Sequence, residues 1–311
     1  MSRKLTYLVS TCNRKKELSS AIDSVLRQDY HPFEIVVVSN GSSDGTAELF
    51  KSGAKYDRKE IRFFDFDKQL GVARARNFGF KNADGDIIVT IDDDAVFADE
   101  DAGSQIVHAF EKDKTIGVLS FTLKNYHTDN IEYPPSSNSP LFSPVVDIPT
   151  LSDLRGWNNP TETTFFPGGA NAIRADVLSE TGLYPPKFAY AGEELDLGYR
   201  VLNAGYYIKY LPSVILLHKW SPKNRLPNAE VLREQLENRI MLSVRNLPWR
   251  YVAATAVFRG IKTFQRARFD PSPVVGAFAS VLASGRELLQ KRDVIDSDVL
   301  TYIDSKSNRI W

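Results

Sequence analysis

The 311-residue chain lacks several features that mark particular classes of protein. Its single cysteine, Cys12, excludes an intrachain disulfide and any zinc site built on several cysteines. It carries no net charge, because 39 Lys and Arg residues balance 39 Asp and Glu residues. Without a positive field to attract phosphate backbones, we expect no nucleic acid among its partners.

Long hydrophobic runs are also missing. The apolar run at residues 5–9 is too short for a signal peptide and leads into the charged residues 14–17. The weakly polar stretches 251–258 and 273–284 fall well below the roughly 20 apolar residues that a membrane-spanning helix needs. We therefore expect a cytoplasmic protein that does not cross a membrane, and the inner face of the membrane is a second location to test.

Short apolar runs alternate with helical patterns over the first hundred residues. Four runs have the length of strands: residues 5–9, 34–38, 61–66 and 87–91. Apolar residues recur at helical spacing in residues 18–26, and residues 72–80 also have a helical pattern. The alternation predicts an α/β fold with a mostly parallel central sheet flanked by helices, and ligands at the edge where the strands end.

The pattern changes in the second half of the chain. Residues 121–166 contain several prolines among Ser and Asn, and we interpret them as a long excursion over an active site. From Arg233 onward the sequence is mostly helical. We predict a first domain at residues 1–222 and a mostly helical C-terminal region at residues 223–311.

Three acids, Asp92, Asp93 and Asp94, directly follow the apolar run 87–91. Crowded carboxylates repel one another unless a cation or a hydrogen-bonded ligand compensates them. Mg²⁺ and Mn²⁺ prefer oxygen ligands and often bridge a carboxylate to a diphosphate. The alternative is an acidic loop that simply ends a strand.

Two other segments carry features of a phosphate or nucleotide site. The glycines in the loop 39–45 would let a ligand approach the backbone, although a plain turn has the same composition. Arg74 and Arg76 stand at the start of a predicted helix, where the helix dipole disfavours positive charge. Either a diphosphate or neighbouring acids such as Asp65, Asp67 and Asp86 would compensate them.

Acids also open the predicted helix at residues 192–200. Asp196 and Arg200 are spaced to pair with each other, which leaves Glu193 and Glu194 to face a cleft. A carboxylate there could act as a general base toward a hydroxyl. His218 follows an apolar run and is either a hydrogen-bonded structural residue or a metal ligand.

In chain order, these segments resemble the family 2 glycosyltransferases, inverting enzymes of the GT-A fold, over about residues 4–222. The segments that carry the resemblance are Val9–Arg14, Glu34–Thr46, Gly71–Gly79, Asp92–Asp94, Gly168–Arg174, Gly192–Arg200 and Gly205–Pro212. Two residues depart from the family pattern. Ser39 replaces an aspartate that helps to recognise the base, and Glu194 replaces the catalytic aspartate.

The resemblance implies a role for each matching position. The residues implied for the nucleoside diphosphate sugar donor are Thr11, Asn13, Arg14, Ser39, Asn40, Asp44, Arg76, Asp92 and Asp93. Asp94 of the Asp-x-Asp motif and His218 would hold the divalent cation, Mg²⁺ or Mn²⁺. Glu194 would be the base, with Glu193 competing for that role. The acceptor side would include Gly169, Asn171, Asp196 and Trp220.

The expected reaction is transfer of a sugar to a hydroxyl of a glycan, lipid-linked or small-molecule acceptor, with inversion and without a covalent intermediate. One alternative is a sugar-phosphate nucleotidyltransferase, although residues 10–16 lack the glycine-rich loop that it would need. The other is a catalytically silent nucleotide- or glycan-binding module, which would not need intact acidic motifs.

The predicted C-terminal region is strongly basic in one part. Residues 245–292 contain nine basic residues and two acids, interleaved with aromatic and aliphatic side chains. This mixture suits an amphipathic helix on an anionic membrane. The same apolar residues could instead pack on the catalytic domain or on a second subunit in a homo-oligomer.

Overall fold

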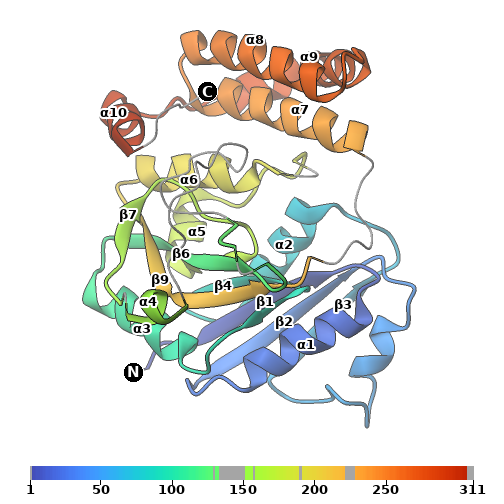
Figure 1. Ribbon diagram of the computed structural model, residues 1–311, viewed down its shortest axis with the longest axis vertical. Coiled ribbons are helices and arrows are strands. Elements are labelled where there is room, and N and C mark those ends of the chain that lie inside the picture. Colours follow the sequence, from blue (N-terminus) through green and yellow to red (C-terminus); the bar gives the residue numbers. More distant parts are fainter. Residues whose placement is uncertain are drawn as a thin grey trace.

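The computed structural model describes residues 2–128, 130–132, 151–156, 158–188, 191–220 and 228–306. A nine-stranded sheet forms its centre, with helices on both faces and a group of C-terminal helices above (Figure 1). Much of the excursion predicted at residues 121–166 lies outside the described residues, as does the predicted domain boundary at residue 222. That boundary stays a prediction.

The strands confirm the four predicted runs and extend three of them. They are β1 (Leu5–Thr11), β2 (Phe33–Asn40), β3 (Ile61–Phe66), β4 (Ile87–Asp92), β5 (Ala95–Phe97), β6 (Ile116–Asn125), β7 (Thr161–Thr163), β8 (Ala170–Arg174) and β9 (Tyr207–His218). Their order is β3-β2-β1-β4-β8-β6-β9-β5, with β7 on β9. The first four of these are parallel, and β8 is antiparallel to both β4 and β6. The alternation of runs predicts the parallel half and not the antiparallel insertion of β8.

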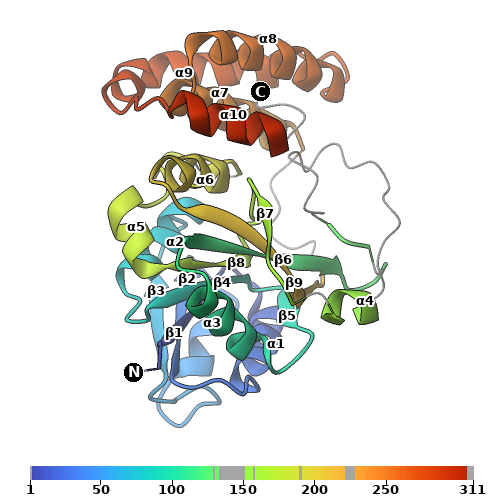
Figure 2. The same cartoon turned by 90° about the vertical axis from the view of Figure 1, so that its left-hand side faces the viewer.

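The helices lie on the two faces of the sheet and in the C-terminal group above it. They are α1 (Lys15–Leu26), the 3-10 helix η1 (Thr46–Phe50), α2 (Val72–Lys81), α3 (Ala102–Lys112), α4 (Leu151–Gly156), α5 (Ala175–Thr181), α6 (Glu193–Asn203), α7 (Asn228–Asn246), α8 (Trp249–Arg266), α9 (Ser272–Gln290) and α10 (Ser297–Lys306). Figures 1 and 2 both place α6 between the sheet and α7. The C-terminal helices are therefore connected to the rest of the fold through the contact of α7 with α6.

Side chains that alternate along the strands divide the core into two layers. In β1, Leu5 and Tyr7 pack toward α1 and α3, and Leu8 packs toward α2. The layer on the Leu8 side continues through Leu197 of α6 to Ile240 of α7. The C-terminal helices thus share a continuous hydrophobic core with one face of the sheet. Among the described residues, no helix is both long and apolar enough to cross a membrane.

The register of the parallel strands brings polar side chains together at one edge. Ser10 of β1 lies opposite Asp92 of β4, and Thr11 lies opposite Ser39 of β2. Because parallel strands end at the same edge, the residues that follow them meet there. This edge forms the floor of the candidate site.

Candidate active site

A cavity of about 890 Å³ lies where β1, β4 and β9 end, with further walls from α6, α7 and α8. Its size is in the range of small-molecule sites in proteins. Most of the residues predicted from the sequence line it: Thr11, Arg14, Asn40, Arg76, Asp92, Asp93, Asp94, Gly169, Glu193, Glu194, His218 and Trp220. The tertiary structure brings them together from segments more than 200 residues apart.

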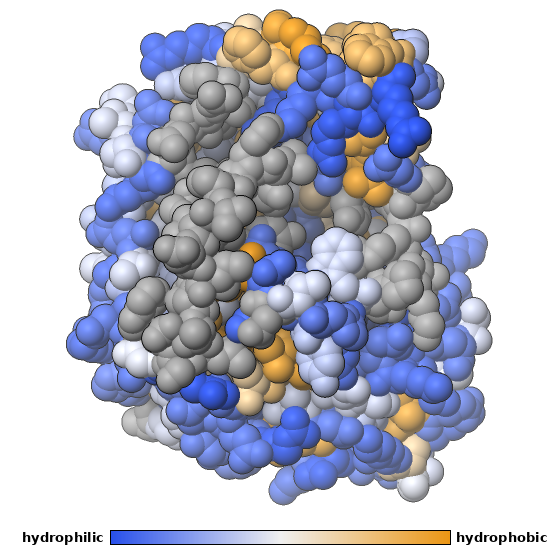
Figure 3. Space-filling model, viewed as in Figure 1, coloured by the Kyte–Doolittle hydropathy of each residue, from blue (hydrophilic) through white to orange (hydrophobic). Residues whose placement is uncertain are grey.

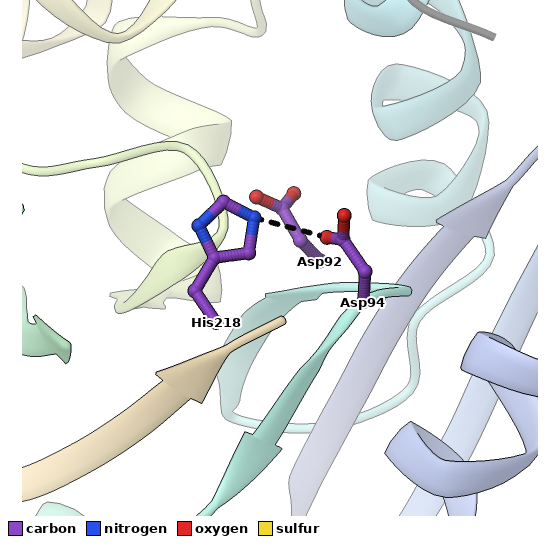
Figure 4. A group of neighbouring side chains, drawn as sticks. All are labelled: Asp92, Asp94 and His218. Atoms are coloured by element: carbon purple, nitrogen blue, oxygen red, sulfur yellow. Dashed lines mark hydrogen bonds and ion pairs between the residues drawn. The ribbon is translucent and has the colours of Figure 1, made fainter. Parts of the chain in front are cut away.

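Asp92, Asp94 and His218 form a cluster that fits a metal ion. Their ligand atoms all lie within 4.8 Å of one another (Figure 4). The antiparallel pairing of β5 with β9 sets His218 opposite Ala95, which places its ring beside Asp94. Two carboxylates and one imidazole suit a divalent cation such as Mn²⁺ or Mg²⁺.

Glu132 orients the histidine of this cluster. Its carboxylate lies 2.8 Å from Nδ1 of His218 and accepts a hydrogen bond from Nε1 of Trp220 at 2.5 Å. Burial by itself lowers the pKa of His218, but the hydrogen bonds to Asp94 and Glu132 raise it to about 10. Sequence reasoning missed Glu132, because it stands in the weakly patterned residues 121–166. In metal sites, a histidine ligand commonly donates its other ring N–H to a carboxylate, which fixes the orientation of the ring.

Asp93 turns toward β1 instead of the metal cluster. Its carboxylate accepts hydrogen bonds from Oγ1 of Thr11 at 2.7 Å and from Arg14 at 2.9 Å. Burial raises the pKa of Asp93 to about 6, against the opposing effects of Arg14 and Thr11. Arg14 also lies 3.2 Å from Asp94 and so joins the two acids.

Arg76 is the buried centre of a second group of acids. It lies 3.0 Å from Asp92 and 3.3 Å from both Glu193 and Glu194. Burial opposes its charge, but the nearby acids, Asp92 first, raise the pKa of Arg76 above its ordinary value. The acids that compensate Arg76 are therefore these three and not Asp65, Asp67 or Asp86. Arg74 instead donates to the carbonyl oxygen of Pro186.

The two glutamates at the start of α6 differ in environment. The side chain of Glu193 is 2% exposed, and that of Glu194 is 14% exposed. Burial and the neighbouring charge of Glu194 raise the pKa of Glu193. Glu194 is thus the more accessible carboxylate of the pair.

The glycines at 168 and 169 leave room for these side chains. A Cβ atom at Gly168 would lie 2.1 Å from Oε1 of Glu194 and 2.3 Å from Nη1 of Arg76. At Gly169 it would lie 2.1 Å from the carboxylate of Asp92. Any larger residue at either position would displace the acidic groups.

Five predicted site residues lie beside the cavity and do not line it: Asn13, Ser39, Asp44, Asn171 and Asp196. Asn13 accepts a hydrogen bond from the backbone of Ser43, and Asp44 accepts them from the backbone of Lys15 and Thr46. These two side chains therefore shape the loop after β2.

The other three are buried. Ser39 lies fully buried in β2, and Asn171 donates to the carbonyl oxygens of Pro167 and Gly168. Asp196 pairs with Arg200 as predicted, and Arg245 and Asn246 of α7 occupy its other oxygen. Asp196 therefore joins α6 to α7, in place of the predicted contact with an acceptor.

Basic residues from α7 and α8 form a further part of the cavity wall: Arg239, Arg259, Lys262 and Arg266. We call this set the basic wall. The sequence prediction assigned three of them to a membrane or packing surface and did not consider Arg239. Positions 259, 262, 263 and 266 follow the i, i+3, i+4, i+7 pattern of one helix face, a signal that could have grouped them.

The chain belongs to the glycosyl transferase family 2, whose sequence model matches residues 6–182. It is 25% identical over 239 residues to the O-antigen chain rhamnosyltransferase RfbN of Salmonella typhimurium, covering 74% of this chain and 70% of that protein. It is 30% identical over 119 residues to the poly-beta-1,6-N-acetyl-D-glucosamine synthase of Staphylococcus epidermidis. That match covers 37% of this chain and 27% of the synthase, so the chain spans only about a quarter of that relative.

Solved structures share the fold at low sequence identity. TarS 1-349 of S. aureus in complex with UDP-GlcNAc matches with a TM-score of 0.59 and 14% identity, over 97% of this chain and 88% of that one. The mannosyltransferase PcManGT of Pyrobaculum calidifontis, in complex with GDP-Man and Mn²⁺, matches with a TM-score of 0.57 and 17% identity, over 98% and 84%. The predicted GT-A fold with C-terminal helices is confirmed. The protein is a glycosyltransferase with relatives in O-antigen and polysaccharide synthesis.

Proposed function

We propose that the protein moves a sugar from a nucleoside diphosphate donor to a hydroxyl of a glycan acceptor, with inversion at the anomeric carbon. One observation carries this proposal: a cluster of side chains that could bind a cation lines the same cavity as the accessible carboxylate of Glu194. Asp92 links the two, because it belongs to the metal cluster and also contacts Arg76. The names of the polysaccharide enzymes among the relatives favour a cell-surface glycan as the product.

Asp92, Asp94 and His218 would hold the divalent cation. The cation would neutralise the diphosphate as it leaves the sugar. PcManGT, which shares the fold, was crystallised with Mn²⁺ and a nucleotide sugar. Thr11, Arg14 and Asn40 line the same cavity and are the proposed donor contacts.

Glu194 is the proposed general base. Its exposure within the cavity lets an acceptor hydroxyl approach, and Arg76, 3.3 Å away, orients it. Glu193 is a poor competitor, because its burial and raised pKa favour the protonated form. Removal of the hydroxyl proton by Glu194 would allow direct displacement of the diphosphate, which inverts the anomeric centre. Gly169 and Trp220 line the cavity as proposed acceptor contacts.

Nucleotide binding with and without a cation tests this proposal. We expect the wild type to bind UDP or GDP in calorimetry with Mn²⁺ and to lose most of this binding in EDTA, because crowded carboxylates repel a diphosphate. Asp94→Ala should weaken cation-dependent binding by roughly tenfold or more and leave the circular dichroism spectrum unchanged. Glu100→Gln, an exposed acid outside the cavity, is the matched control. Equal nucleotide affinity in Mn²⁺ and in EDTA would contradict the proposal.

A further inference from the structure

The basic wall lines the same cavity as the acids and comes from different elements. Arg239 belongs to α7, and Arg259, Lys262 and Arg266 belong to α8. At 3.6 residues per turn, the three positions on α8 share one face of that helix. Thr263 lies on the same face and also lines the cavity.

Two residues of this wall are not held in ion pairs by the described part of the chain. Arg239 and Arg266 form no hydrogen bond or ion pair within the part of the chain that the structure describes. Glu234 lines the cavity nearby, but its carboxylate pairs with Arg233 at 3.1 Å. Burial lowers the pKa of Arg239, although the charge of Glu194 partly opposes this effect. A partly buried guanidinium without a partner is unfavourable, and an anion would stabilise it.

We propose that the basic wall binds a phosphate or diphosphate group of the acceptor. Guanidinium groups bind phosphate oxygens in pairs of hydrogen bonds, which would fix the acceptor with its hydroxyl toward Glu194. The inference rests on the proposed function, because it assigns the ligand to the acceptor. The donor diphosphate is expected in another part of the cavity, near Asp94 and Arg76.

Calorimetry with inorganic pyrophosphate in EDTA tests this site without relying on catalysis. We expect binding by the wild type and by Asp94→Ala, and at least about a tenfold loss of affinity in Arg259→Gln/Lys262→Gln, since each contact is charge-assisted. Arg239→Lys should weaken binding less, because it keeps the charge and loses the paired geometry. Arg286→Gln is the matched control: it lies exposed on α9 and does not line the cavity.

Farnesyl diphosphate distinguishes two sources of the phosphate. Tighter binding than pyrophosphate would assign the group to a lipid-linked acceptor, and equal binding would assign it to a soluble phosphorylated acceptor. No pyrophosphate binding, or an equal loss in Arg286→Gln, would overturn the proposal. So would basic-wall variants that weaken UDP binding in Mn²⁺, because the wall would then serve the donor. Failure of the proposed function appears separately, as cation-independent nucleotide binding.

The opposite face of α8 carries a second and independent feature. Val257 and Ile261 are 56% and 53% exposed and lie about half a turn around the helix from Arg259. On α9, Val275, Leu282 and Leu289 recur every seven residues and are at least half exposed. Figure 3 shows apolar side chains at the top of the molecule, over these two helices. Together these five residues form an outer apolar face.

The charges around this face favour one kind of partner. Arg250, Arg268, Arg286 and Lys291 are exposed on or next to α8 and α9. Of the two acids in the region, Glu287 is already paired with Lys187 at 2.6 Å and Lys291 at 2.9 Å. Three of these basic residues, Arg250, Arg268 and Arg286, form no ion pair within the described part of the chain. Apolar side chains flanked by such charges suit the surface of an anionic bilayer. We infer that the outer apolar face rests on an anionic membrane, with the basic wall on the other side of α8.

Co-sedimentation with vesicles tests the membrane inference. We expect pelleting with phosphatidylcholine vesicles that contain phosphatidylglycerol, less pelleting at high salt, and none with phosphatidylcholine alone. Ile261→Glu/Leu282→Glu should lower the bound fraction at least about tenfold, because it places charge in the apolar contact. Val294→Glu, an exposed apolar position outside α8 and α9, is the control. Absence of binding to anionic vesicles at low salt would overturn the inference, as would a dimer in light scattering that Leu282→Glu disrupts.

Discussion

The acids of the cavity and its basic wall differ in how far their charges are compensated by ion pairs. At the edge of the sheet, Asp92 contacts Arg76, Asp93 contacts Arg14, and Asp94 contacts both Arg14 and His218. On the basic wall, Arg239 and Arg266 have no counter-ion within the described residues. The acidic side is therefore organised before any ligand binds, whereas Arg239 and Arg266 of the basic wall keep their charge available for one.

This difference follows from the elements that carry each side. Strand pairing fixes Asp94 and His218 through the ladder between β5 and β9, so their positions depend on backbone hydrogen bonds. The basic wall stands on α7, which packs against α6, and on α8, which packs against α7. Groups that act on a reacting bond benefit from such a preorganised position. Groups that hold a remote part of a substrate tolerate a looser one.

The largest effect expected on the acidic side is that of the base. Glu194→Gln should lower kcat by roughly 10²-fold or more, because the amide keeps the shape and cannot accept a proton. Donor affinity should stay within a few-fold of the wild type. Glu193→Gln, the matched control on the same turn, should cost far less. If Glu193→Gln causes the larger loss of kcat in a transfer assay, the assignment of the base is wrong.

A second substitution tests the connection between α6, which carries Glu193 and Glu194, and α7, which carries Arg239 of the basic wall. Asp196 is fully buried, lying 2.8 Å from both Arg200 of α6 and Arg245 of α7. Asp196→Ala leaves two arginines without their shared partner and should lower the free energy of unfolding by about 3 to 5 kcal/mol. Urea denaturation followed by tryptophan fluorescence measures this loss. A loss below about 1 kcal/mol, as for an exposed pair, would contradict the link.

The same aspartate predicts a dependence of stability on pH. Burial alone would raise the pKa of Asp196, but Arg200 and Arg245 bring it below its ordinary value. The unfolded chain therefore binds a proton more readily than the folded one, so this contribution is present above about pH 4 and is lost as the pH falls below it. Asp196→Asn should show a shallower loss of unfolding free energy below pH 4 than the wild type. Parallel curves for the two proteins would contradict this assignment.

The smallest expected effect concerns the space in front of Glu194. Gly168→Ala adds a methyl group 2.1 Å from Oε1 of Glu194 and 2.3 Å from Arg76, so both flexible ends must shift. We expect about a tenfold loss of kcat with an almost unchanged melting temperature, since a displacement of about 1 Å disturbs catalysis more than folding. Gly156→Ala is the control, because among the described residues no heavy atom beyond its chain neighbours and its own helix backbone lies within 4 Å of the new Cβ. Equal kcat values for the two variants would show that the clash is relieved without moving the base.

The sequence alone determined the parallel half of the sheet and the acids at its edge. Runs such as 61–66 and 87–91 are local patterns, and the alternation of strand and helix already implies a shared carboxyl edge. The end of β4 and the turn after it therefore place Asp92, Asp93 and Asp94 at this edge, independently of the later part of the chain. The pairing of Asp196 with Arg200 was equally visible, because four residues make one turn of a helix.

Only the tertiary structure decided which charges meet. Arg76 and Glu193 are 117 residues apart, and His218 and Glu132 are 86 apart, so no local period relates them. The antiparallel insertion of β8, which brings Gly168 and Gly169 to the acids, depends likewise on the packing of distant segments. The basic wall could not be predicted from the sequence for the same reason. A helix pattern shows which residues of α8 share a face, but the packing of α7 and α8 over α6 decides that this face looks into the cavity.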